Sequence, residues 1–259
     1  MQAAKIFDLT GQVALVTGAS SGLGARFARV LAANGAKVVC VARRRERLDV
    51  LASEIKSDGG EALAIAADVT DRSAMALAFD AGLETYGRVT ILVNNAGIAR
   101  QSRLLDQPEA TWREVLDVNL DAVYANALMG AQHMVAARVA GSIINIASIL
   151  GFNVAKSLSA YAVAKAGVVQ LTKAMALELA GQNIRVNAIA PGYFVTEINQ
   201  DFLTTEKGQA MARQVPMGRF GAQNDLDGCL LLLASPAGAF ITGTSVVVDG
   251  GQLLGIRGA

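Results

Sequence analysis

Short apolar runs alternate with longer segments of helical periodicity along most of the chain. The runs are rich in Val, Ile and Ala, which is typical of strands buried on both faces of a parallel sheet. They lie at Val13–Thr17, Lys37–Val41, Ala62–Ala66, Thr90–Val93, Ser142–Ala147, Arg185–Ala190 and Ser245–Val248. Together they predict a seven-stranded sheet.

Helical patterns occupy the stretches between these strands. The clearest examples are Gly22–Asn34, Arg44–Ser57, Asp71–Tyr86 and Ser159–Ala180. Strands that alternate with helices indicate βαβ units, whose crossovers place helices on both faces of a parallel sheet. The pattern therefore predicts an α/β fold, a Rossmann-like doubly wound sheet formed by a single domain over residues 1–259. Residues 196–215 interrupt the alternation, and a long insert at this position predicts a lid over a substrate site.

Composition and charge narrow the function classes. With 53% hydrophobic residues and a net charge of +1, the chain is too apolar for disorder and has little electrostatic attraction for nucleic acid. The longest uncharged stretch, 228–248, contains two turn-forming clusters, so no membrane span is expected. The first ten residues lack the apolar core of a signal peptide. Because Cys40 and Cys229 lie in apolar runs, we expect reduced thiols, no metal site and a cytoplasmic location.

Two predicted helices are unusually apolar. The segment Ala122–Ala137 carries no charged residue, and Ala162–Leu177 carries only two lysines. A helix that covers one face of a sheet normally shows a polar outer stripe. We therefore expect a second subunit to cover these helices, and we predict a homotetramer. The alternative is an alanine-rich surface that tolerates exposure to water.

A glycine-rich turn follows the first predicted strand and opens a helix. Glycines allow the backbone to approach a pyrophosphate, and the helix N-terminus supplies free N–H groups and a partial positive charge. Such a turn also has purely structural uses, but its place in the first βαβ unit favours dinucleotide binding. The candidate residues are Gly18, Ser20, Ser21, Gly22, Leu23 and Gly24.

The end of the second predicted strand indicates which nicotinamide cofactor binds. An NAD site places an acidic residue there, about 20 residues after the glycines. Here the strand is followed by Arg43, Arg44 and Arg45. Three cations at a helix N-terminus are unfavourable unless an anion joins them, and the 2′-phosphate of NADP(H) is such an anion. We expect Arg43 to bind this phosphate and NADP(H) to be preferred over NAD(H), with a solvated charged turn as the alternative.

A tyrosine and a lysine four residues apart are candidates for proton transfer. Tyr161 and Lys165 project from one helix face, and a nearby ammonium group is expected to lower the pKa of the phenol from about 10. Ser148 lies just beyond the fifth predicted strand. Each residue alone also has ordinary structural uses. Their combination with the glycine-rich turn favours catalysis.

These motifs resemble those of the short-chain dehydrogenase/reductase family, in its branch of about 250 residues. The resemblance covers nearly the full chain, from Leu9 to Gly251. It implies a nicotinamide cofactor and the interconversion of an alcohol and a carbonyl. The matching motifs are the glycine-rich turn, Asp68-Val69, Asn94-Asn95-Ala96-Gly97, Val118-Asn119, Ser148, Tyr161-x-x-x-Lys165, Pro191-Gly192 and Asp249-Gly250-Gly251.

The resemblance also implies roles for individual residues. Tyr161 exchanges a proton with the substrate oxygen, Ser148 holds that oxygen, and Lys165 lowers the pKa of Tyr161 and binds the nicotinamide ribose. Asn119 is expected at a helix bend, where it holds a water in a proton relay. Further residues are expected to line the cofactor site, namely Arg44, Asp68, Val69, Asn95, Ala96, Gly97, Pro191, Gly192, Val195 and Thr196.

The expected substrate pocket is mainly apolar, which favours a ketone or secondary alcohol of small or medium size. Its predicted residues are Ile98, Ser148, Leu150, Val154, Tyr161, Tyr193 and Phe202. A 3-oxoacyl thioester and a sugar or polyol remain alternative substrates. Acyl-carrier reductases of this family use arginines to dock the carrier, and the matching positions here are the uncharged Val139 and Gln182. A non-catalytic sensor on the same fold is the alternative from another class of protein.

Overall fold

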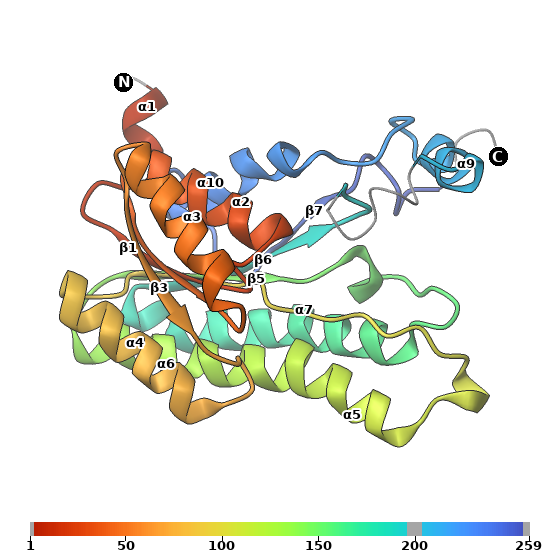
Figure 1. Cartoon of the computed structure of the whole chain (residues 1–259), viewed down its shortest axis with the longest axis horizontal. Helices are drawn as coiled ribbons and strands as arrows, with labels where there is room; N and C mark the ends of the chain where they lie inside the picture. The colour runs from red at the N-terminus through yellow and green to blue at the C-terminus, as the bar shows by residue number, and fades with distance from the viewer. Residues whose placement is uncertain (1–2, 196–203, 256–259) are drawn as a thin grey trace.

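The computed structural model describes residues 3–195 and 204–255. Within them, seven strands form one parallel sheet in the order β3-β2-β1-β4-β5-β6-β7 (Figure 1). The strands are β1 (Val13–Thr17), β2 (Lys37–Ala42), β3 (Glu61–Ala66), β4 (Ile91–Asn94), β5 (Gly141–Ile146), β6 (Ile184–Pro191) and β7 (Ser245–Val248). The predicted sheet is thus confirmed, with most strand ends shifted by one residue.

Helices connect the strands and cover both faces of the sheet. The shorter helical segments are α1 (Ala3–Ile6), η1 (Leu104–Asp106), η2 (Asp117–Asp121), η3 (Ile149–Gly151), η4 (Ala180–Gln182), η5 (Gln223–Leu226) and η6 (Pro236–Gly238). The longer ones are α2 (Gly22–Ala33), α3 (Arg45–Ser57), α4 (Arg72–Tyr86), α5 (Glu109–Leu116), α6 (Ala122–Ala136), α7 (Ser159–Leu179), α9 (Glu206–Gln214) and α10 (Asp227–Ala234).

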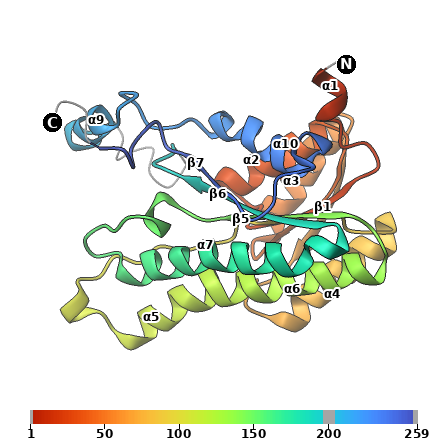
Figure 2. The same cartoon turned by 180° about the vertical axis from the view of Figure 1, so that it is seen from behind.

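The two faces of the sheet bury separate apolar cores. Helices α2, α3 and α10 lie on one face, and α4, α6 and α7 lie on the other (Figures 1 and 2). Phe27, Leu48 and Leu230 represent the first core, whereas Phe79 and Met134 represent the second. Because side chains alternate along each strand, every central strand contributes to both cores. This explains the high apolar fraction that the sequence shows.

Local signals define the helix ends. At the start of α4, the Asp71 carboxylate accepts hydrogen bonds from the backbone N–H groups of Ser73 and Ala74, as an N-cap residue does. The same helix ends at Gly87, whose φ of 81° lies in the left-handed region. Of the predicted lid, residues 204–215 are described and contain α9. No helix in the described ranges is long and apolar enough to cross a membrane.

The sheet order changes direction between β1 and β4, which are neighbours. Open parallel sheets bind ligands beyond the carboxyl ends of the strands at such a switch point. The turn after β1 and the loop after β4 both begin there. The chain therefore brings residues from distant parts of the sequence to one edge of the sheet.

Candidate active site

A cavity of about 800 Å³ lies at this edge of the sheet. The glycine-rich turn lines one part of it, and Ser148, Tyr161 and Lys165 line another. Most of the residues expected to bind the cofactor line this one cavity: Gly18, Ser20, Ser21, Gly22, Leu23, Gly24, Arg43, Arg44, Asp68, Val69, Asn95, Ala96, Gly97, Tyr161, Lys165, Pro191 and Gly192.

The glycine-rich turn packs directly against the loop that follows β4. The Asn95 side-chain Nδ2 donates to the Thr17 carbonyl over 2.9 Å, and the Thr17 hydroxyl accepts from the Asn95 backbone N–H over 3.0 Å. A Cβ at Gly24 would lie 2.5 Å from Asn95 Nδ2, and Gly18 has a φ of +67°. Both positions therefore require glycine. At these glycines no side chain separates the backbone from the cavity, so a dinucleotide pyrophosphate could approach the backbone closely.

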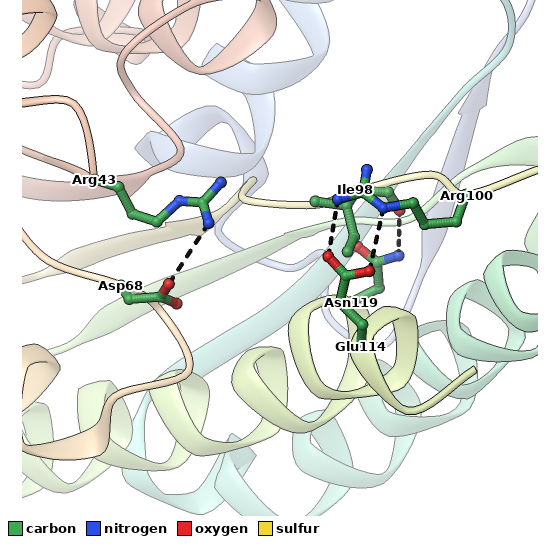
Figure 3. A network of polar contacts seen from close by, with 6 residues as sticks. All are labelled: Arg43, Asp68, Ile98, Arg100, Glu114 and Asn119. Carbon is green, nitrogen blue, oxygen red and sulfur yellow. Dashed lines mark hydrogen bonds and ion pairs between the residues drawn. The ribbon is translucent and has the colours of Figure 1, made fainter. Parts of the chain in front are cut away.

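Two adjacent arginines occupy different places at the end of β2. The Arg44 guanidinium donates to Ser20 Oγ over 2.9 Å and to Ser21 Oγ over 2.8 Å, so it lies over the glycine-rich turn. Arg43 instead lies 3.8 Å from the Asp68 carboxylate across the cavity rim (Figure 3). Arg45 forms an ion pair with Asp49 on α3 and does not line the cavity. The sequence predicts that Arg43 binds the phosphate, and the structure places Arg44, not Arg43, over the glycine-rich turn.

Tyr161 and Ser148 meet at the cavity wall. Ser148 follows β5, is 92% buried, and its Oγ accepts a hydrogen bond from the Leu150 N–H over 3.1 Å. Burial raises the pKa of the Tyr161 phenol above its ordinary value, and a hydrogen bond with Ser148 offsets part of this rise. The lowered pKa that the sequence predicted is therefore not found, because burial outweighs the interactions that favour the phenolate.

Lys165 is buried beneath Tyr161. Its Nζ donates to the Ile146 carbonyl over 2.7 Å and lies 5.6 Å from the centroid of the Tyr161 ring. Burial lowers the pKa of this ammonium group to about 8. At neutral pH the lysine is still mainly charged, and its charge faces the tyrosine ring in a poorly solvated site.

Asn119 lies in the π-helical turn η2, which joins α5 to α6 at the place where a bend was expected. Its Oδ1 accepts from the Ile98 N–H over 2.9 Å, and its Nδ2 donates to the Ile98 carbonyl over 2.7 Å (Figure 3). A Cβ at Gly97 would lie 2.9 Å from Asn119 Oδ1 and 3.8 Å from Lys165 Nζ. The Asn119 side chain thus fixes the loop after β4 close to Lys165.

The same loop is held a second time further along. The Arg100 guanidinium donates to both carboxylate oxygens of Glu114, over 2.8 and 3.2 Å (Figure 3). Glu114 lines the cavity from α5. A bidentate pair of this kind restricts the orientation of both side chains and also neutralises their charges.

The predicted substrate pocket is only partly found. Ile98, Leu150 and Tyr193 line the cavity, whereas Val154 is 78% exposed and lies outside its lining. The loop between η3 and α7 directs Val154 toward solvent. Val195 also lies outside the lining, where its N–H donates to the Gly221 carbonyl. Thr196 and Phe202 lie outside the residues that the structure describes.

Several lining residues were absent from the predicted set. Leu158 lines the cavity immediately before α7, and Glu114 and Val118 line it from α5 and η2. Val118 stands beside Asn119 in a motif of the sequence, which is a usable signal. Leu158 and Glu114 carry no such signal, because only the fold brings them to the cavity.

Comparisons with known proteins identify relatives of this chain. The family model for short chain dehydrogenases matches residues 12–207. Galactitol 2-dehydrogenase (L-tagatose-forming) from Cereibacter sphaeroides is 42% identical, over 95% of this chain and 96% of the relative. 3beta-Hydroxysteroid dehydrogenase 1 from Eggerthella lenta is 41% identical over 95% of both chains. The 3-oxoacyl-(acyl-carrier-protein) reductase FabG of Thermotoga maritima is 37% identical, over 95% of this chain and 99% of the relative.

Solved structures with the same fold are also similar to this chain. A gluconate 5-dehydrogenase from Burkholderia cenocepacia, in complex with NADP and tartrate, superposes with a TM-score of 0.91 at 36% identity. The match covers 97% of this chain and 98% of that one. The fold and the cavity define an oxidoreductase of the Rossmann-like class that binds NAD(P). The chain belongs to the short-chain dehydrogenase/reductase family.

Proposed function

We propose that this protein is an NADP(H)-dependent oxidoreductase that interconverts a ketone and a secondary alcohol by hydride transfer. The observation that carries the proposal is the convergence of Ser148, Tyr161 and Lys165 on one cavity wall beyond the glycine-rich turn. A hydroxyl, a phenol and an ammonium group in this order suit proton transfer to a carbonyl oxygen. The substrate oxygen binds between Ser148 and Tyr161.

Each polar group has a distinct task in this proposal. The raised pKa keeps Tyr161 protonated at neutral pH, so it donates its proton to the carbonyl oxygen during reduction. Ser148 donates a hydrogen bond to the same oxygen and orients it. Lys165 supplies the positive charge that favours the phenolate after transfer. Asn119 holds the loop beside Lys165, and the water relay expected from the family stays a prediction.

NADP(H) fits the other half of the cavity and supplies the hydride when it is bound. Gly18 and Gly24 leave the turn open to a pyrophosphate. Arg44 stands over Ser20 and Ser21, where its guanidinium and the two hydroxyls would hold the 2′-phosphate. Arg43 adds a second cation at the rim. The NADP complex of the Burkholderia relative supports this assignment.

The substrate end of the cavity favours a neutral, mainly apolar carbonyl. Among the described residues at this end, Lys165 and the ion-paired Glu114 are the charged ones, and the other side chains that accompany Ser148 and Tyr161 carry no charge. Arg100 beside them is already occupied by Glu114. The apolar side chains are Ile98, Ile149, Leu150, Leu158 and Phe194.

Two other substrate classes are represented among the relatives. The galactitol dehydrogenase acts on a polyol, and the FabG relative reduces an acyl-carrier thioester. A sugar requires several hydrogen-bonding groups, which the described pocket wall supplies sparingly. The steroid dehydrogenase among the relatives supports an apolar ketone or alcohol as the substrate class of this chain. A non-catalytic sensor is disfavoured because the catalytic set is complete.

We further propose that the chain assembles as a homotetramer through α6 and α7. These helices lie side by side on the outer layer (Figure 2), and each exposes large apolar side chains, including Leu128 and Val163. Exposed apolar surface of this kind marks subunit contacts. Static light scattering should give four times the chain mass, and a Val163→Asp variant should give a smaller particle. A wild-type monomer at micromolar concentration would refute the assembly. A cytoplasmic location also stays a prediction, supported by the two unpaired cysteines.

A panel assay tests the proposed activity. Cyclic and linear ketones, a polyol and a 3-oxoacyl thioester are each incubated with NADPH and with NADH, and absorbance at about 340 nm is followed. We expect the apolar ketones to be reduced fastest, and NADPH to give the larger kcat/KM. Equal efficiency with both cofactors would overturn the NADP preference. A polyol or thioester that exceeds every ketone would overturn the substrate class.

A further inference from the structure

The wall of the cavity beside Tyr161 is fixed by two contacts from a distant loop. Between Gln101 and Ala110, which follow β4, nearly every residue is exposed. Ser102 and Gln107 are the exceptions. Both contact the three-residue segment 157–159, whose last residue, Ser159, begins α7.

The two contacts hold the residues on either side of Leu158. The Ser102 N–H donates to the Ser157 carbonyl over 2.9 Å. The Ser159 hydroxyl donates to Gln107 Oε1 over 2.8 Å, in a partly buried place. The Leu158 carbonyl itself accepts from the Ala162 N–H over 2.9 Å. Hydrogen bonds therefore hold the Ser157 and Leu158 carbonyls and the Ser159 side chain, three consecutive residues.

The backbone before Leu158 adopts a conformation that serine rarely takes. Ser157 has a φ of +64°, in the left-handed region. Such a conformation is unfavourable for a residue other than glycine and persists where the surroundings impose it. The contact from Ser102 is the tertiary interaction that holds the Ser157 carbonyl. The bend turns the chain so that Leu158 faces the cavity that Ser148 and Tyr161 also line.

We propose that Leu158 determines the size of substrate that this site accepts, and that Gln107 and Ser159 are positioning residues that hold it there. The inference rests on the proposed ketone reductase activity. Leu158 lies three residues before Tyr161, so its side chain meets the carbon skeleton of a ketone whose oxygen is bound by Tyr161 and Ser148. A rigid apolar wall at this place favours small carbonyls and excludes larger ones.

Truncation of the side chain tests the specificity role. The probes are cyclohexanone and trans-1-decalone, each reduced with NADPH. The Leu158→Ala variant should shift the ratio of their kcat/KM values about tenfold toward decalone, because three carbon atoms leave the wall. Leu158→Met, which conserves volume, should leave the ratio within about threefold of the wild type. An unchanged ratio in the alanine variant, with turnover retained, would overturn this inference alone.

Removal of the side-chain contact tests the positioning role. Gln107→Ala and Ser159→Ala should each raise the KM for cyclohexanone and reduce size discrimination, with little change in the melting temperature or in the Kd for NADPH. The double variant should resemble the single ones, because both remove the same hydrogen bond. Ser57→Ala is the matched control, since Ser57 Oγ donates to the Glu54 carbonyl on the exposed surface of α3.

The outcomes separate this inference from the activity on which it rests. If the wild type reduces no carbonyl in the panel, the proposed function fails and this inference fails with it. If the wild type reduces ketones and the contact variants keep the wild-type discrimination, only the positioning role of Gln107 and Ser159 fails.

Discussion

Lys165 and Ile146 are joined by a hydrogen bond of 2.7 Å between the lysine Nζ and the isoleucine carbonyl oxygen. This bond holds Ile146, the last residue of β5, against α7, the helix that carries Tyr161. It also retains the lysine in a buried place, where its pKa falls to about 8. The bond thus fixes Lys165 relative to the strand that leads to Ser148, while burial lowers the pKa of the lysine.

Removal of the Tyr161 hydroxyl should abolish turnover and leave cofactor binding nearly intact. The Tyr161→Phe variant lacks the proposed proton donor, so we expect kcat to fall by about 10³-fold or more. Steady-state assays give kcat, and a fluorescence titration with NADPH gives the Kd of the cofactor. Tyr86→Phe is the control, because Tyr86 ends α4 and does not line the cavity. Retained turnover in Tyr161→Phe would mean that another group donates the proton.

The pH dependence of oxidation should differ from that of reduction. Oxidation of a secondary alcohol needs the Tyr161 phenolate, whose fraction grows with pH. Because the pKa of the phenol is raised, we expect kcat/KM for oxidation to increase throughout the range from pH 7 to about 10. Reduction uses the protonated phenol and should not increase over this range. Steady-state profiles in both directions measure this, and an oxidation rate independent of pH would contradict it.

Lys165 should make stability depend on pH between 8 and 10.5. In this window the unfolded chain retains the lysine proton, whereas the folded chain releases it at a pKa of about 8. Folding is therefore penalised below pH 8, and the penalty disappears as pH rises to 10.5. Relative to Lys165→Met, the wild type should gain about 2 kcal/mol in unfolding free energy from pH 7 to pH 10.

Urea denaturation of both proteins at several pH values gives this difference. Titration of every other group largely cancels, because the two chains differ at one residue. A constant difference across this range would show that Lys165 titrates alike in the folded and unfolded chains.

Loss of the Arg44 side chain should weaken the binding of NADPH and leave that of NADH nearly unchanged. Its hydrogen bonds to Ser20 and Ser21 place the guanidinium over the turn, and a charge-assisted contact to phosphate contributes about 1.5–3 kcal/mol. Arg44→Ala should therefore raise the KM for NADPH about tenfold or more and change that for NADH little. Arg45→Ala, which removes a charge already paired with Asp49, should change neither. Equal losses with both cofactors would mean that Arg44 only supports the turn.

A methyl group at Gly24 should disrupt the cofactor site and destabilise the fold. The added Cβ would lie 2.5 Å from Asn95 Nδ2, which holds the turn to the loop after β4. We expect Gly24→Ala to abolish NADPH binding and to lower the melting temperature. Gly181→Ala is the control, because nothing lies within 4 Å of its added Cβ. A stable variant with wild-type affinity would show that the turn can relax.

The periodicity of the chain was sufficient to predict the sheet and most of its crossover helices. Each central strand is buried on both faces, so it appears in the sequence as a continuous apolar run that can be recognised without knowing its neighbours. The glycine-rich turn, Ser148, Tyr161 and Lys165 were also recognisable, because their chemistry needs particular residue types. The direction of the Tyr161 pKa shift could not be predicted from the sequence, because the burial of the phenol depends on packing from several elements.

Local patterns and fixed spacings along the chain were enough to predict the α/β architecture, the nicotinamide cofactor class and the three residues proposed as catalytic. The sequence pattern did not show that Arg44 rather than Arg43 lies over the turn, that Val154 points away from the cavity, or that Leu158 faces it. The physical reason is that side-chain direction and burial are set by contacts between segments far apart in the chain. Gln107 and Ser159, separated by 52 positions, are one such contact.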